Sequence, residues 1–354
     1  MAVYYCDQSI GTASGAGTIG DPFGTLQYAL STIDRSIDAV TGDVLHLTGD
    51  ASGLSALTVS TSNNPLLICG YATTAYDLAG WDWRDDSPAT LPTIDFGSST
   101  DLWSSVRTDI SWQNVKIVCR DVTMNSRTKL LECDFVCREM LMRVDGQLER
   151  SRVTGISGYR GVSNAYGQCV IRGNCIHADS VASGYYGISL VSGSVVQRNR
   201  MTLNGINVIG IRIAQNNAET LCNVANNSIV MLGSSGYQEG IQVKSGYMIV
   251  ESNVVVGATR AISDNQLEPP TLRITNNKFY DCDAGVDFQI SGNFAVNATG
   301  NATLSSAPYT DPSTGDWTLS DELSSITDGY GVTPGAVQAT ATGGVAAVHP
   351  LGGA

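Results

Sequence analysis

The chain has 354 residues, of which 42% are hydrophobic and only 15% are charged, and its formal net charge is −13. This negative charge repels phosphate backbones and no Lys/Arg-rich block offsets it, so nucleic acid is excluded as an expected partner. No apolar run of about 18 residues or more is present, so no membrane partner is expected, and the N-terminus lacks the pattern of an export signal.

A helix is predicted close to the N-terminus. Asp21 is expected to cap it and Pro22 to occupy its first position, because an acidic cap followed by proline is a common helix start. Leu26, Ala29 and Leu30 then fall on one face of the helix. An apolar face of this kind would close the open end of a stacked core.

A repeat dominates the sequence from residue 170 onward. Each copy has an apolar residue, two or three polar residues, an asparagine, any residue and then an apolar residue. A weaker form extends back to at least residue 130. The repeated asparagines step by 25, 28, 26, 24 and 24 residues, and they are Asn174, Asn199, Asn227, Asn253, Asn277 and Asn301. A period of this length is typical of solenoids, in which each copy is one coil.

A second feature keeps step with the asparagines. In each coil a small residue precedes a β-branched one, at Gly161-Val162, Gly187-Ile188, Gly210-Ile211, Gly240-Ile241, Ala261-Ile262 and Gly285-Val286. Apolar residues at alternating positions predict short strands with one buried face. Asparagine and glycine between the strands are expected to supply left-handed turns, and asparagines in register to hydrogen-bond along the stack.

These features predict an all-β fold: a right-handed parallel β-helix solenoid with a short N-terminal capping helix. A leucine-rich horseshoe is the alternative fold. It needs a Leu-rich frame and a helix in each repeat, and neither is visible in the sequence.

The N-terminal third also resembles the pectate-lyase-like superfamily of right-handed β-helices. The matching phrases are a short strand at Val3–Asp7, a glycine-rich loop at 15–20, Pro22-Phe23-Gly24-Thr25 and Gly42-Asp43, and the tail phrase at 315–320 resembles closing phrases of other members. With the repeat, the resemblance implies an N-terminal strand and capping helix at 1–40, coils at 41–304 and a C-terminal cap at 305–338. The segment 339–354 is rich in Ala, Gly and Thr and lacks strand patterning, so it is expected to be a flexible or partner-binding arm. It implies no single activity, because the superfamily includes lyases, hydrolases, epimerases and structural virion proteins.

The nine cysteines are expected to be buried, reduced thiols, because their number is odd and most lie inside apolar runs. Zinc is the alternative, with Cys133 and Cys137, or Cys169 and Cys175, as ligand pairs. Neither pair has the spacing of a structural zinc site. No metal or other cofactor is therefore predicted, although calcium would be expected if the chain were a lyase. Free thiols indicate synthesis in a reducing compartment.

No catalytic residue is assigned from the sequence. The acidic and basic phrases that the resemblance implies for hydrolases have no match in the central coils, and Asp85-Asp86 lies in an early loop. His46, His177 and His349 are the only histidines, and none is placed for general acid–base chemistry. A role without catalysis is favoured.

Side chains of successive coils should form rows on the outside of the stack. With the glycine–isoleucine pair as register, the residues predicted to meet on one outer face are Arg212, Glu239, Arg260, Tyr185, Tyr186 and Tyr237. One interpretation is a carbohydrate-binding face, on which aromatic rings stack on sugars and charged groups bind hydroxyls or a uronate. The alternative is an ion-pair ladder that adds little stability. Trp81 and Trp83, in a long loop, form a second candidate patch, but such loops also simply cover coils.

The functional hypothesis resolves a conflict between fold and compartment. Members of the superfamily mostly act outside cells, whereas this sequence shows no export signal and keeps nine thiols. A phage virion protein is made in the host cytoplasm and acts outside after lysis. The leading hypothesis is therefore a virion structural protein, namely a capsid decoration, a fibre or a tailspike-like appendage. It is expected to form a homotrimer, to contact other virion proteins and to bind polysaccharide. Two alternatives stay open: an extracellular polysaccharide lyase or glycosidase, and a bacterial surface β-helix protein.

Overall fold

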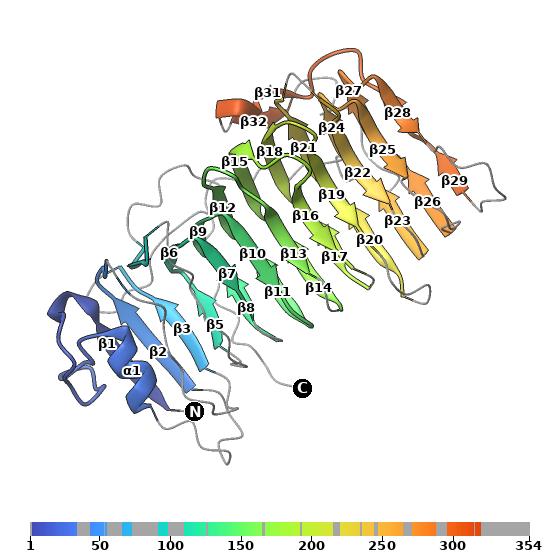
Figure 1. The fold of residues 1–354 in the computed structure, drawn as a ribbon. Helices are drawn as coiled ribbons and strands as arrows, with labels where there is room; N and C mark the ends of the chain where they lie inside the picture. The colour runs from blue at the N-terminus through green and yellow to red at the C-terminus, as the bar shows by residue number, and fades with distance from the viewer. Residues whose placement is uncertain are drawn as a thin grey trace.

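The computed structural model describes residues 2–33, 43–52, 54, 66–72, 91–97, 110–124, 127–164, 167–191, 193–214, 220–233, 236–243, 247–264, 271–287, 296–314 and 316–319. Over these residues the chain winds as a stack of coils into an all-β, right-handed parallel β-helix, which confirms the predicted fold (Figure 1). Most coils pass one strand through each of three parallel sheets. We call these sheets 1, 2 and 3, in the order in which the chain crosses them.

Sheet 1 has twelve strands among the described residues: β1 (Val3–Asp7), β2 (Asp43–Thr48), β3 (Leu66–Gly70), β5 (Ile110–Gln113), β8 (Lys129–Leu131), β11 (Gly146–Glu149), β14 (Cys169–Arg172), β17 (Val195–Gln197), β20 (Cys222–Ala225), β23 (Tyr247–Glu251), β26 (Thr271–Thr275) and β29 (Val296–Thr299). Sheet 2 has ten in the same segments: β4 (Thr93–Asp95), β6 (Lys116–Val118), β9 (Asp134–Cys137), β12 (Arg152–Gly155), β15 (Cys175–Val181), β18 (Arg200–Gly205), β21 (Ser228–Met231), β24 (Val254–Val256), β27 (Lys278–Tyr280) and β30 (Ala302–Thr303).

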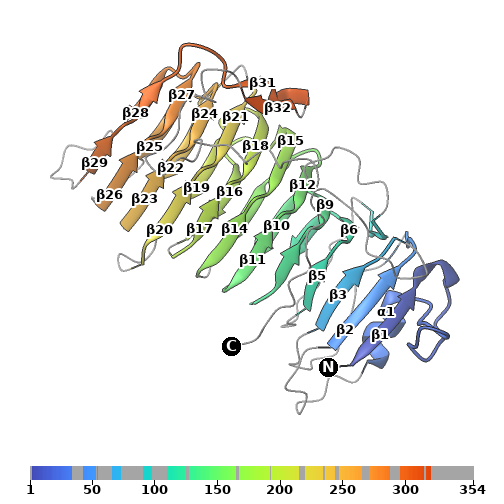
Figure 2. The ribbon, with the colours of Figure 1, turned by 180° about the vertical axis from the view of Figure 1, so that it is seen from behind.

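Sheet 3 begins one coil after sheet 2. Its eight strands within the described ranges are β7 (Asp121–Thr123), β10 (Glu139–Met142), β13 (Gly161–Asn164), β16 (Tyr186–Leu190), β19 (Ile209–Ile213), β22 (Glu239–Val243), β25 (Arg260–Asp264) and β28 (Ala284–Asp287). Each strand pairs in parallel with its counterparts in the coils before and after it, so a residue type repeated at one position of the coil becomes a row along the stack (Figure 2).

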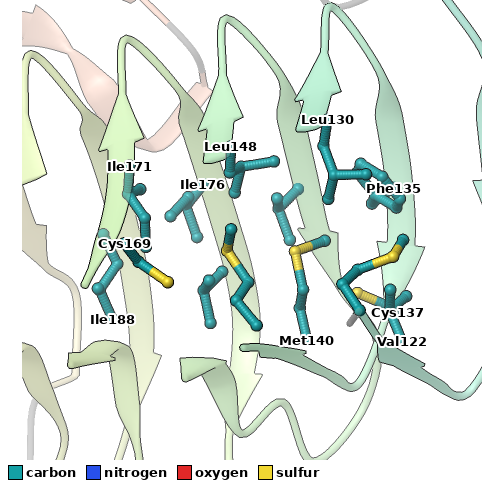
Figure 3. Close-up of a cluster of buried hydrophobic side chains, with 14 of the residues drawn as sticks. Val122, Leu130, Phe135, Cys137, Met140, Leu148, Cys169, Ile171, Ile176 and Ile188 are labelled. Atoms are coloured by element: carbon teal, nitrogen blue, oxygen red, sulfur yellow. The ribbon is translucent and has the colours of Figure 1, made fainter. Parts of the chain in front are cut away.

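The core consists of such rows pointing inward from all three sheets. Figure 3 shows Leu130, Leu148 and Ile171 from sheet 1 and Phe135 and Ile176 from sheet 2 in the same interior. Sheet 3 contributes Val122, Met140 and Ile188, all of them buried. The alternating apolar pattern in the sequence therefore places one continuous core along the axis.

The repeated asparagines form a buried ladder at the corner between sheets 1 and 2. The side-chain oxygen of Asn199 accepts both the backbone N–H and the side-chain amide of Asn174, at 3.0 and 2.9 Å, and Asn199 makes the same bonds to Asn227. The ladder continues in this way to Asn301. The predicted hydrogen bonding along the stack is confirmed, and these asparagines are structural.

The predicted source of the left-handed turns was partly wrong. Positive φ falls on the residue before each ladder asparagine, as in Asn226 at 56° and Asn276 at 58°, and not on the ladder asparagine itself. The preceding residue turns the chain, which leaves the asparagine free to point inward and to bond along the stack. Because Arg198 and Ser252 take this conformation as well, the position does not require asparagine or glycine.

The N-terminal helix starts later than predicted. Helix α1 (Leu26–Thr32) is capped by Thr25, whose hydroxyl accepts the N–H of Tyr28 at 3.2 Å, so Asp21 is not the cap and Pro22 is not the first helical residue. The reason is that residues 21–23 run along the edge of β1, where the N–H of Phe23 donates to the carbonyl of Tyr5 at 2.9 Å. The predicted apolar face is confirmed, because Leu26, Ala29 and Leu30 are buried in the core. Figure 1 places α1 at the end of the stack.

A hairpin near the other end lies against the outer side of sheet 2. Strands β31 (Tyr309–Asp311) and β32 (Asp316–Leu319) are antiparallel, and the 3-10 turn Pro312–Thr314 joins them. Tyr309 and Trp317 pack with the outward-facing Val230 and Val254, and the Tyr309 hydroxyl bonds the Ser228 hydroxyl at 2.5 Å. The chain thus turns back over earlier coils (Figures 1 and 2).

All nine cysteines are free; seven are buried, and Cys175 and Cys282 are partly buried, which confirms the predicted buried thiols. Burial raises the pKa of Cys133 to about 12 and that of Cys137 well above its ordinary value. Protonated thiols are poor metal ligands, because a metal binds the thiolate. Within the described segments, no helix has the length and apolar content needed to span a bilayer.

Candidate functional site

Two rows of side chains run along the outer side of sheet 3. The pairing of its strands confirms the predicted register, because Tyr186 pairs with Ile209, Ile209 with Glu239, and Glu239 with Arg260. The second row is Ser189, Arg212, Gln242 and Ser263. Strands β16, β19, β22 and β25 therefore bring the predicted residues onto one face in four consecutive coils (Figures 1 and 2).

Three arginines on this face stack on tyrosines. The guanidinium carbon of Arg212 lies 4.7 Å from the centre of the Tyr186 ring, and that of Arg260 lies 4.8 Å from the Tyr237 ring. Arg160, one coil before Tyr185, lies 5.3 Å from the Tyr185 ring. Each pair joins adjacent coils. We call the surface formed by these six residues with Glu239 and Gln242 the arginine–tyrosine face.

The contact between Arg212 and Tyr186 has two parts. In addition to the stacking, Nη1 of Arg212 donates a hydrogen bond to the Tyr186 hydroxyl. The Nε of Arg212 is buried and has no hydrogen-bond partner among the described residues. Burial lowers the pKa of this guanidinium, which nevertheless stays charged because arginine starts from 12.5.

The floor of the face is polar and buried. Glu239, Gln242 and Ser263 are 3%, 4% and 0% exposed. Gln242 donates from Nε2 to the Glu239 carboxylate, whereas the Ser263 hydroxyl has no partner within the part of the chain that the structure describes. A buried polar group without a partner costs free energy.

The loop before β22 fixes the position of Tyr237. Its N–H donates to the side chain of Asn207 at 2.9 Å, and Asn207 itself has a left-handed backbone. The next residue, Gln238, makes two further bonds. Its side-chain amide donates to the carbonyl of Gly205 at 2.9 Å, and its backbone N–H donates to the Thr259 hydroxyl at 3.1 Å. These bonds hold the Tyr237 ring at the rim of the face, where it is 37% exposed.

Ion pairs occupy the end of sheet 3 that is closer to the N-terminus. Arg138 pairs with Asp121, which raises the pKa of Arg138, and Arg160 lies 3.8 Å from the Glu139 carboxylate. Farther along, the partner of Arg212 is a tyrosine and the partner of Glu239 is a glutamine. The ion-pair ladder, which the sequence analysis kept as the alternative, is thus found in the first coils of sheet 3. In the following coils the arginines stack on tyrosines.

Comparison with known proteins gives two solved structures. No family model and no curated protein matches the sequence. Both structures are titled as the periplasmic alginate epimerase AlgG. A mutant of that enzyme aligns with a TM-score of 0.38 and 11% identity, and the second structure aligns with 0.35 and 12%. Each alignment covers 79% of this chain and 82% of the other.

The other sequence candidates are not on this face. Trp81, Trp83, Asp85-Asp86, His349 and the arm at 339–354 lie outside the described residues. His46, on sheet 1, stacks on Tyr71 with ring centres 4.6 Å apart, and burial lowers its pKa. His177, on sheet 2, lies 3.0 Å from Asp179. Among the described residues, no group of three or more His, Cys, Asp and Glu side chains is arranged to hold a metal ion.

Sequence reasoning missed three members of the site as functional residues. Arg160, Gln242 and Ser263 stand at the same coil positions as the selected residues in the glycine–isoleucine register, but they were not selected. A usable signal was present, because tyrosines occur at 185, 186 and 237 while arginines occur one coil before or after them. Arginine and tyrosine in neighbouring coils favour cation–π stacking.

Proposed function

We propose that this β-helix binds an extended, anionic polysaccharide along the arginine–tyrosine face of sheet 3. The observation that carries the proposal is the set of three stacked pairs, Arg160 with Tyr185, Arg212 with Tyr186, and Arg260 with Tyr237. Three arginines on one face stand out in a chain of net charge −13.

The chemistry of a stacked arginine suits an acidic sugar. A guanidinium that lies flat on a ring directs its N–H groups sideways, and two parallel N–H groups match a carboxylate or sulfate. Arg160 and Arg212 already have partners in Glu139 and Tyr186, so a bound carboxylate would share these cations with them. The tyrosines add apolar surface for sugar C–H groups and a hydroxyl for sugar oxygens. Both halves of each pair therefore recognise part of a uronate unit.

The arrangement suits a linear ligand. From Arg160 to Arg260 the face crosses four coil steps, which is about 19 Å at the usual strand spacing. A polymer lying along the stack meets a cation at intervals. A small monosaccharide would contact only one pair.

Whether the protein belongs to a virion or acts as an extracellular enzyme stays a prediction from the sequence. A polysaccharide-binding β-helix fits the hypothesis of a virion appendage, and it equally fits the extracellular polysaccharide enzyme that the sequence analysis left open. The homotrimer, the contacts with other virion proteins and the role of calcium stay predictions as well.

Affinity electrophoresis through gels containing a polysaccharide tests the proposal. The panel contains hyaluronate, polymannuronate, polygalacturonate and neutral dextran. We expect retardation by at least one of the three acidic polymers and none by dextran. Arg212→Ala and Arg260→Ala should each weaken binding about tenfold or more, as expected for loss of a charge-assisted bond.

Arg273→Ala is the matched control. Arg273 lies on sheet 1, 3.7 Å from Glu251, away from the arginine–tyrosine face. Its removal should leave retardation unchanged. Equal loss of binding in Arg212→Ala and Arg273→Ala, with both variants folded, would show that binding depends on overall charge and would overturn the proposed face.

A further inference from the structure

The surroundings of Tyr186 suit a role in catalysis as well as in ligand binding. Its hydroxyl accepts a hydrogen bond from Arg212 Nη1, and the same guanidinium covers its ring at 4.7 Å. A cation that donates to a phenol oxygen stabilises the phenolate over the neutral phenol. A phenolate is a base strong enough to take a proton from carbon next to a carboxylate.

Arg160, in the coil before, is a second cation, and it lies 3.8 Å from the Glu139 carboxylate. The pairing of Val162 with Ile188 places Arg160 and Tyr186 at the same position of neighbouring coils. A uronate carboxylate held by Arg160 would set the adjacent C5 hydrogen near the Tyr186 oxygen. Binding of that carboxylate by a cation also stabilises the negative charge that develops when C5 loses its proton.

We propose that Tyr186 is the catalytic base of a β-elimination that cleaves the bound polysaccharide, with Arg212 as its positioning residue. The inference rests on the proposed function. The Tyr186 phenolate takes the C5 proton, the electron pair forms the C4=C5 double bond, and the bond from C4 to the bridging oxygen breaks. The phenol then returns its proton to that oxygen, which regenerates the phenolate and requires no oxidant, reductant or water.

Because Tyr186 acts first as the base and then as the acid, the mechanism restricts which uronate can be the substrate. The C5 hydrogen and the C4 oxygen must lie on the same side of the ring for a single hydroxyl to reach both. This holds for glucuronate and mannuronate units, whereas in galacturonate and guluronate the two groups lie on opposite sides. The substrate class is therefore a polymer containing glucuronate or mannuronate.

The charged and titratable groups around Tyr186 in the described residues are few. Arg212 faces it from β19, Arg160 lies at its position in the coil before, and the ring of the neighbouring Tyr185 is 6.2 Å away. Glu239 lies two coils farther along, and its carboxylate bonds to Gln242. Glu139, two coils before Tyr186, lies 3.8 Å from Arg160 and offsets its charge. Arg212 is therefore the cation in direct contact with the phenol.

The test is release of unsaturated uronate ends from hyaluronate and polymannuronate, followed by ultraviolet absorbance. Wild-type protein should produce them and should leave polygalacturonate intact. Tyr186→Phe should lower the rate about a hundredfold or more, the usual contribution of a general base. The same variant should still be retarded by the bound polymer, because the ring that stacks on Arg212 is kept.

Two further variants separate chemistry from structure. Arg212→Gln should shift the acidic limb of the pH–rate profile to higher pH, since the phenolate loses its cation, and a merely structural role would lower the rate without that shift. Tyr247→Phe, at an exposed position on sheet 1, should cleave like wild type. Binding of hyaluronate or polymannuronate without unsaturated ends, or full activity of Tyr186→Phe, would overturn the inference and leave the proposed function standing. Failure to bind any acidic polymer would overturn both.

Discussion

The side-chain oxygen of Asn277 accepts two hydrogen bonds from Asn253, one from its backbone N–H at 3.0 Å and one from its side-chain amide at 2.9 Å. Asn253 also donates to the carbonyl of Val224 and accepts from Asn227 in the coil before. One fully buried amide thus satisfies groups in three coils, which explains why the repeat keeps asparagine at this position.

Asn253→Ala should therefore be strongly destabilising. The substitution leaves several buried donors and acceptors without partners, and the expected loss is about 3 kcal/mol or more of unfolding free energy. Asn204→Ala, at an exposed position on β18, is the control and should change stability little. Urea unfolding of both variants checks this. Equal, small effects would show that the ladder contributes little net stability.

The small residue before the isoleucine of each coil faces a close neighbour. A Cβ at Gly240 would lie 2.4 Å from Val255 Cγ1 and 2.6 Å from the carbonyl oxygen of Ala261. Gly240→Ala should destabilise the protein by about 1–3 kcal/mol through overpacking. Gly20→Ala, where no atom lies within 4 Å, should be close to neutral. A Gly240→Ala variant as stable as wild type would contradict the close packing at this row.

Asp134 should make stability depend on pH. Burial raises its pKa above the ordinary 3.8, although Arg152 and Lys116 act in the opposite direction. The folded protein then binds this proton more tightly than the unfolded chain, so unfolding free energy falls as pH rises from about 4 through the raised pKa. Asp134→Asn should remove that fall and be more stable than wild type at neutral pH. Asp179→Asn, with an exposed carboxylate, should retain it.

The thiols should react in two classes. Burial raises the pKa of Cys6 and Cys133 to about 12 and of Cys169 to about 11, which leaves little thiolate at neutral pH. Iodoacetamide should therefore modify native protein at no more than the partly buried Cys175 and Cys282, and all nine cysteines after unfolding. Mass spectrometry gives the count. Rapid native labelling of Cys133 or Cys169 would contradict the burial of these side chains.

The sequence specified the coil because periodic residues report contacts that repeat. The spacing of Asn174 and its counterparts predicted the register of sheet 1. The spacing of Gly210 and Gly240 predicted the register of sheet 3. Asp21 was misassigned because its local cap pattern competes with a tertiary contact, the pairing of Phe23 with Cys6 along β1. A local pattern cannot report that competition.

The arginine–tyrosine face was predicted only in outline. Its rows follow from the repeat, but Tyr237 lies in a loop whose path depends on bonds to Asn207, Gly205 and Thr259. Contacts of this kind involve loops of unequal length and leave no period in the sequence. The hairpin that covers sheet 2 did leave a signal. Ile229, Val230 and Met231 are apolar at consecutive positions, and strands of that kind are buried on both sides.

A crystal structure with a bound hexasaccharide of glucuronate or mannuronate units tests most directly whether sheet 3 is the ligand-binding face. We predict that the oligosaccharide lies along the stack over Tyr186 and Tyr237, with carboxylates at Arg212 and Arg260. An oligosaccharide bound on sheet 1 or sheet 2, with the arginine–tyrosine face empty, would contradict the proposed function.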